Sequence, residues 1–165
     1  MSARFFRPVV RIALLFAVLA SLFAPSVAAA RDPEPWATVN VCDTAKQPDT
    51  IGIRASMPGT PKGVRLSMRF RVQYKVDDNT WADVEDADSG WRLVGTAKGV
   101  PVESGWSFSF TRPSKAVTLR GVVRFRWRKG DALPRTAEVA TEAGHRSAAG
   151  SDPVGYSAAS CSLGS

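Results

Sequence analysis

The sequence predicts an all-β protein, folded as a single sandwich of about seven to nine antiparallel strands. The first observation is that apolar and polar residues alternate in several short segments, which is typical of strands with one buried face. The second is that clusters of turn-forming residues separate these segments, about every 8–12 residues. The third is that no segment after residue 31 keeps apolar residues at helical spacing long enough for a sizeable helix.

Length and composition agree with one globular domain. The chain has 165 residues, of which 44% are hydrophobic and 22% are charged. This composition excludes a collagen-like, coiled-coil or wholly disordered chain. Even without its first thirty residues, the chain is long enough for one domain with its own core, and it is too short for two.

Three segments carry the strongest alternation, at 64–76, 104–111 and 118–128. We expect their apolar faces to meet in one core. The residues expected there are Leu66, Met68, Phe70, Val72, Trp106, Phe108, Phe110, Val123, Phe125 and Trp127. Weaker alternation predicts further strands at 36–42, 51–57, 90–95, 135–143 and 154–163. The alanine-rich segment 137–149 is the one place where a short helix competes with a strand.

Residues 1–30 have the three parts of a secretory signal peptide, and the mature domain is expected to span 31–165. A basic start precedes an apolar run at 12–24, and small residues follow it. The run is too short to cross a bilayer as a helix, so an uncleaved anchor is the weaker alternative. Cleavage after Ala29 or Ala30 fits equally well. We therefore expect a secreted, extracellular protein with no transmembrane segment in its mature chain. Loss of three arginines with the signal leaves 19 basic and 15 acidic residues, or a net charge of +4.

The number and spacing of the strands, with a long penultimate strand at 119–129, resemble the immunoglobulin-like and fibronectin type III-like domains of secreted bacterial proteins. The resemblance covers about residues 36–163 and is one of architecture, with no sequence motif behind it. It implies that 64–76 and 118–128 are neighbours in one sheet. It implies no activity.

The two cysteines of the chain, Cys42 and Cys161, fall in the first and last expected strands. In an exported protein two cysteines most often form one disulfide, and the first and last strands of a sandwich commonly lie side by side. The alternatives are a redox pair or a metal site. A redox pair usually has Cys-x-x-Cys spacing, and a metal site needs more ligands than the single histidine of the chain.

Basic residues alternate with the core residues of two strands, and we consider them a candidate face for an anionic ligand. They are Arg69, Arg71, Lys75, Arg120, Arg124, Arg126 and Arg128. Arginine binds phosphate and carboxylate groups with two parallel hydrogen bonds, so an anionic surface polymer or another exported protein is a possible partner. The other interpretation is a solvated face that Glu138 and Glu142 neutralise. Nucleic acid is not expected, because Phe125 and Trp127 share the buried face of Val123 and are not available to stack on bases.

The acidic segment 83–88, between Trp81 and Trp91, is the other chemically distinct feature. Its carboxylates suggest calcium or a glycosidase pair, but the spacing does not fit the twelve-residue calcium loop, and the acids are close neighbours in sequence. We expect a solvated hairpin loop here, and an exposed loop position for His145.

The sequence therefore predicts an exported, non-catalytic protein that binds a ligand or forms part of the cell surface, with no cofactor and no metal. The alternative is a carbohydrate-active enzyme or other hydrolase that uses the carboxylates near 83–88. An inhibitor or adhesion module that uses the loop 144–152 is a third hypothesis, because function in sandwiches often lies on end loops. Convergence of the 83–88 carboxylates and the two tryptophans in one cleft would favour the hydrolase.

Overall fold

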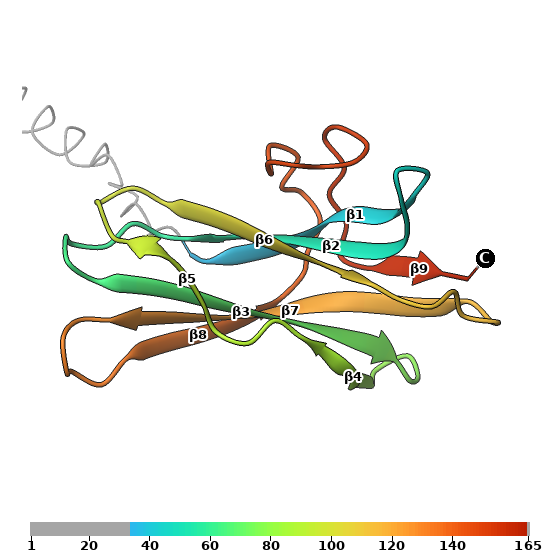
Figure 1. Ribbon diagram of the computed structural model, residues 1–165, viewed down its shortest axis with the longest axis horizontal. Coiled ribbons are helices and arrows are strands. Elements are labelled where there is room, and N and C mark those ends of the chain that lie inside the picture. Colours follow the sequence, from blue (N-terminus) through green and yellow to red (C-terminus); the bar gives the residue numbers. More distant parts are fainter. Residues whose placement is uncertain (1–33, 165) are drawn as a thin grey trace, which may run out of the picture. The chain divides into compact units, whose positions relative to one another are not determined.

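The computed structural model describes residues 34–164, which form nine strands and no helix (Figure 1). The strands are β1 (Trp36–Thr44), β2 (Gln47–Met57), β3 (Arg65–Lys75), β4 (Trp81–Asp88), β5 (Arg92–Thr96), β6 (Val102–Ser109), β7 (Val117–Arg128), β8 (Arg135–Ala140) and β9 (Cys161–Leu163). The expected signal peptide at 1–30 lies outside the described residues. No helix in the described part of the chain could cross a membrane.

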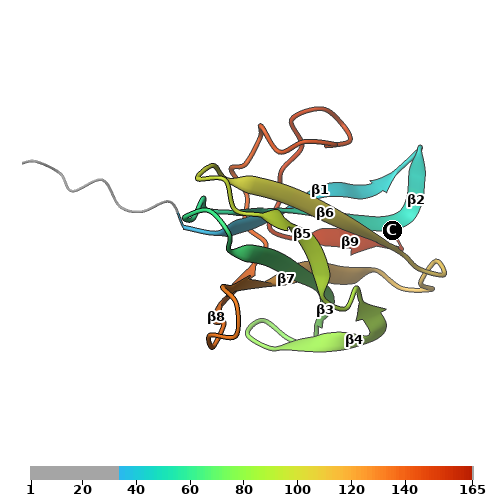
Figure 2. The ribbon, with the colours of Figure 1, turned by 60° about the vertical axis from the view of Figure 1, so that its left-hand side comes forward.

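The strands form two antiparallel sheets that pack face to face (Figures 1 and 2). The smaller sheet has the order β1-β2-β6. In the larger sheet β3 and β7 are central neighbours; β4 and β5 pair with different parts of β3, and β8 and β9 pair with different parts of β7. The predicted all-β fold with two sheets is confirmed, as is the pairing of the two longest alternating segments.

The core lies between the sheets and contains the predicted apolar faces. In the register of β3 and β7, Leu66 lies opposite Trp127 and Met68 opposite Phe125. The seven predicted core residues of these two strands are all buried. Three predicted core residues lie on β6 or directly after it: Trp106, Phe108 and Phe110. They pack against this core but are only partly buried. They lie at the side of the sandwich, because β6 is an edge strand of its sheet.

A glycine allows the two sheets to approach closely at the centre of β7. Gly121 lies opposite the buried Val72 on β3. A Cβ atom at position 121 would lie 2.6 Å from Cδ1 of Ile53 on the other sheet. Only a hydrogen atom fits between the Gly121 backbone and this isoleucine.

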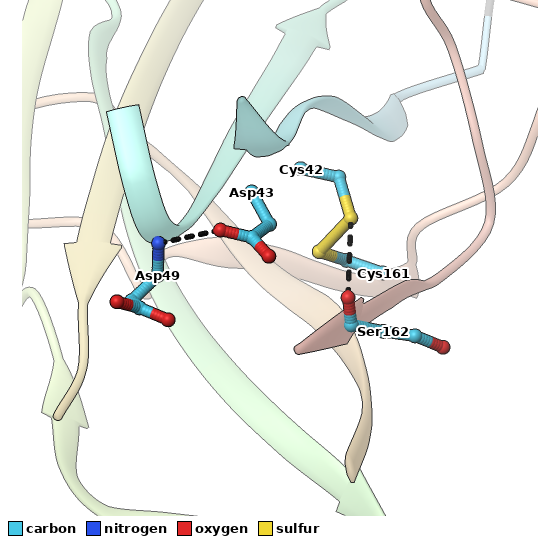
Figure 3. Close-up of a disulfide and its surroundings, with 5 residues drawn as sticks. All are labelled: Cys42, Asp43, Asp49, Cys161 and Ser162. Carbon is cyan, nitrogen blue, oxygen red and sulfur yellow. Dashed lines mark hydrogen bonds between the residues drawn. A yellow bond between two sulfur atoms is a disulfide. The ribbon is translucent and has the colours of Figure 1, made fainter. Parts of the chain in front are cut away.

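The predicted disulfide between Cys42 and Cys161 is present and joins the two sheets (Figure 3). Cys42 lies on β1 of the smaller sheet, and Cys161 lies on β9, which pairs with β7 of the larger sheet. Their Cα atoms are 5.4 Å apart. The first and last strands are thus close across the sandwich, but they are not hydrogen-bonded neighbours. Beside the bridge, the Asp43 carboxylate accepts a hydrogen bond of 2.7 Å from the Asp49 amide and closes the β1–β2 turn.

Two parts of the chain differ from expectation. The acidic segment 83–88 is not a loop: it forms most of strand β4. The segment expected as a strand at 154–163 is a strand only at 161–163. The absence of a helix at 137–149 agrees with the expectation. Instead, irregular chain at 142–158 runs along the outer edge of β1 (Figure 1). There the amide of Val39 donates to Ala158, and the amide of Asp152 donates to Asn40.

Candidate anionic-ligand face

The structure brings the seven predicted basic residues together on the outer face of the larger sheet. They alternate with buried residues along β3 and β7, so their side chains leave the opposite face from the core. Arg69 lies directly opposite Arg124, and Arg65 lies directly opposite Arg128. Like charges directly opposite each other destabilise a sheet unless other groups compensate them.

Acidic side chains compensate three cations of β3, namely Arg69, Arg71 and Lys75. Arg69 binds the Asp88 carboxylate with its Nε and Nη2 atoms. Arg71 reaches in two directions, at 3.0 Å to Asp83 on β4 and at 3.0 Å to Glu138 on β8. Lys75 pairs with Asp78 in the turn that follows β3, also at 3.0 Å. The part of the face from Arg69 to Lys75 on β3 is therefore neutralised.

Arg120 on β7 is held by neutral groups. Its Nε and Nη2 atoms donate to Oε1 of Gln73, at 2.9 and 2.8 Å. Its guanidinium lies over the ring of Trp81, 4.3 Å from the ring centre. Burial lowers the pKa of Arg120, but arginine remains charged at neutral pH. Gln73 also donates to Asp83, so Arg120 joins the network of the paired cations.

The remaining cations form a group without acidic partners, which we call the arginine cluster: Arg65, Arg124, Arg126 and Arg128. Arg126 lies over the ring of Trp91 at 4.1 Å and makes no ion pair with a described residue. Arg124, Arg128 and Arg65 are exposed and likewise pair with no acid within residues 34–164. Positive charge is thus concentrated at the end of the face where β3 begins and β7 ends.

The acids that neutralise the face differ in part from those expected. Glu138 lies opposite Arg124 in the register and pairs with Arg71, as the neutralising interpretation requires. Glu142 does not reach this face. It lies beyond β8 and contacts His145 at 2.9 Å.

His145 is a further correction, because it is half-buried. Its ring stacks on Trp36 with the ring centres 4.1 Å apart. The loop position expected for His145 is confirmed, but its expected exposure is wrong. The irregular chain covers the edge of β1, so the His145 side chain packs on Trp36, and nothing in the sequence marks it as buried.

Sequence reasoning missed Asp83 and Asp88 as partners of the arginines. The available signal was the alternation of Trp81 and Asp83, which lie on one face of β4. In the register of β3 and β4, Trp81 lies beside Lys75 and Asp83 beside Gln73. Because aspartate is rare in strands, the aspartate-rich segment was not expected to form one.

The carboxylates of 83–88 and the two tryptophans do not meet in one cleft. Asp83 and Asp88 point to the outer face, whereas Glu85 and Asp86 line a groove beside β6. Trp81 and Trp91 lie against Arg120 and Arg126, which are six residues or roughly 20 Å apart along β7. Residues 34–164 contain no group of three or more His, Cys, Asp or Glu that could hold a metal ion.

Comparison with known proteins adds no relative: no family model, no curated protein and no solved structure matches this chain.

Proposed function

We propose that the protein is an exported, non-catalytic binding module with an immunoglobulin-like sandwich, and that the arginine cluster binds an anionic ligand. One observation carries this proposal: acids neutralise Arg69, Arg71 and Lys75 on β3, while the arginine cluster has no acidic partner among residues 34–164. A disulfide between distant strands is compatible with an oxidising, extracellular location.

The spacing of the cluster favours a polymer with repeated phosphate or carboxylate groups. Alternate residues of a strand lie about 6.6 Å apart, so Arg124, Arg126 and Arg128 present a row of guanidinium groups. Each guanidinium matches one phosphate or carboxylate with two hydrogen bonds. An anionic ligand would also relieve the repulsion between the opposed Arg65 and Arg128.

The alternative proposal, a hydrolase that uses the carboxylates near 83–88, has weaker support. Arg71 and Arg69 hold Asp83 and Asp88 in ion pairs on the outer face. The hydrogen bonds from Arg69 also lower the pKa of Asp88, which makes it a poor general acid. Glu85 and Asp86, which line a groove, are adjacent residues, and no other carboxylate within residues 34–164 lines that groove.

Retention on a heparin resin at increasing salt tests the binding proposal. The variant Arg124→Glu/Arg128→Glu should elute at much lower salt than the wild type, because exposed charges act over about 10 Å at moderate ionic strength. The control variant Lys46→Glu/Arg146→Glu has the same net charge, with both changes at exposed sites in other parts of the chain. Retention close to the wild type is expected for this control. Equal elution of the two variants would show that only net charge matters and would contradict the proposal.

A further inference from the structure

One edge of the smaller sheet is covered by another segment of the described chain, and the other edge is not. The outer edge of β1 is covered by 142–158, which exchanges backbone hydrogen bonds with Val39 and Asn40. On the other side β6 pairs only with β2, and no backbone hydrogen bond joins its outer edge to any other segment within 34–164. Exposed edge strands are sites where another chain can add a strand.

The free groups on β6 can be identified from its register. The amide of Phe110, just past the strand end, donates to the carbonyl of Asp49 at 2.9 Å, so it points toward β2. Because direction alternates along a strand, the amide and carbonyl groups of Ser109, Ser107 and Gly105 point away from β2. These residues have small side chains, and neither proline nor lysine blocks the edge between Val102 and Ser109.

A groove runs beside this edge, between β6 and β4. It has a volume of about 300 Å³ and is lined by Glu85, Asp86 and Ala87 on β4 and by residues 107–110 at the end of β6. Phe108 and Phe110 are half-buried there. Glu85 and Asp86 are exposed and make no ion pair with a described residue. The groove therefore combines aromatic surface with uncompensated negative charge.

We propose that the free edge of β6 accepts an extended, basic segment of a partner protein as an added strand. Backbone hydrogen bonds to Ser107 and Ser109 would hold the segment, and its alternate side chains would enter the groove. A lysine or arginine there covers the phenylalanines with its stem and brings its charge to Glu85 and Asp86. This proposal concerns a different surface from the arginine cluster and stands independently of it.

Charge also argues against a second copy of this chain as the occupant. Antiparallel pairing of two β6 edges about a twofold axis is self-complementary, so it would bring two copies of the same acidic groove together. Their carboxylates would repel each other, whereas a basic segment would be attracted.

Fluorescence anisotropy at low salt, with the purified full protein, tests the proposal. The probe is a short blocked peptide in which lysine alternates with threonine; matched peptides carry glutamate in place of lysine, or N-methyl groups at alternate positions. Both changes should weaken binding at least about tenfold, the first by charge repulsion and the second by removal of backbone donors. N-methylation is tested in both registers, on the lysines in one peptide and on the threonines in another. If both methylated peptides bind as tightly as the unmethylated lysine probe, strand addition is overturned.

The matched protein variants are Ser107→Pro and Ser107→Ala. Proline removes the outward amide of residue 107 and leaves the ladder to β2 in place, so it should abolish binding, while alanine should not. If the proline variant fails to fold, amide hydrogen exchange in the wild type decides: the Ser107 and Ser109 amides should exchange fast alone and slowly with the lysine probe. Unchanged exchange would overturn the proposal. So would a stable dimer that Ser107→Pro dissociates, since a second copy would then occupy the edge.

Discussion

Arg69 and Asp88 form a two-point ion pair across the outer face of the larger sheet. The Nε atom of Arg69 donates to both oxygens of Asp88 at 2.9 Å, and its Nη2 atom donates to one of them. The amide of Gly90 adds a third donor to this carboxylate at 2.8 Å. The hydrogen bonds from Arg69 are the main reason why the pKa of Asp88 lies below its usual value.

The first prediction concerns stability in acid. A carboxylate whose pKa is lowered by folding stabilises the native state above the ordinary aspartate pKa, about 3.9, and this stabilisation is lost as the pH falls below it. Asp88→Asn should therefore lower the free energy of unfolding by about 1 kcal/mol or less near neutral pH, and by less near pH 2. Urea unfolding at both pH values measures this difference. As a control, Asp131→Asn changes a carboxylate with no ion pair in the described residues; an equal pH effect there would refute the assignment to Asp88.

The second prediction concerns the bridge between the sheets. Cys42 and Cys161 are 119 positions apart, so the bond closes a long loop and restricts the unfolded chain. Replacement of both cysteines by alanine should cost about 2–5 kcal/mol of unfolding free energy. Denaturant unfolding measures the loss, and thiol titration of the denatured wild type should find no free thiol. Unfolding midpoints that coincide would mean that the bridge adds nothing.

The third prediction concerns the close contact at Gly121. A methyl group at this position would overlap Ile53, so Gly121→Ala should destabilise the fold by about 1–3 kcal/mol. Ile53→Val removes the Cδ1 atom nearest to the new methyl group and costs about 0.5–1.5 kcal/mol alone. The double variant should lose less than the sum of the two single losses, because one change relieves the other. Strict additivity would show that the two residues do not press on each other.

The fourth prediction separates the centre of the core from its open side. Phe125 is fully buried, and Phe125→Ala should cost about 3–5 kcal/mol. Phe108→Ala should cost less, because Phe108 lies at the groove beside the edge strand and is already partly exposed. Parallel urea titrations give both values. A larger loss at position 108 would mean that the groove is closed in solution.

Alternation alone was enough to predict the inner faces of β3 and β7, because a slip of one residue would expose Phe70 or Phe125 and bury arginines. The pairing of Cys42 with Cys161 followed from the presence of only two cysteines and from the signal peptide that the sequence predicts. These features are encoded in side-chain type, which the sequence displays directly.

The features that could not be predicted from the sequence have a different physical origin. The cover of the β1 edge by 142–158 uses backbone groups, for example Glu142 to Ala37 and Ala158 to Val39, and backbone bonding leaves no periodic side-chain pattern. The split of the basic face into a paired and an unpaired part depends on the register between β3 and β4. A bulge between Arg71 and Gln73 sets that register and brings Asp88 within reach of Arg69. Such bulges cannot be read from alternation.

The last prediction tests whether Trp91 holds the Arg126 side chain in the position needed for ligand binding. The Arg126 guanidinium lies 4.1 Å from the centre of the Trp91 ring, at a half-buried position. Attraction between a cation and an aromatic face is worth about 0.5–1 kcal/mol at exposed sites, so a double-mutant cycle with Arg126→Gln and Trp91→Leu should give a coupling of this size. The same cycle with the exposed Arg124→Gln in place of Arg126→Gln should give a coupling near zero.

Because the ring fixes one guanidinium in the row, Trp91→Leu should also reduce heparin retention without any change in net charge. Coupling at Arg126 with unchanged retention would assign Trp91 to stability alone, and no coupling would show that the stacked arrangement is not held in solution.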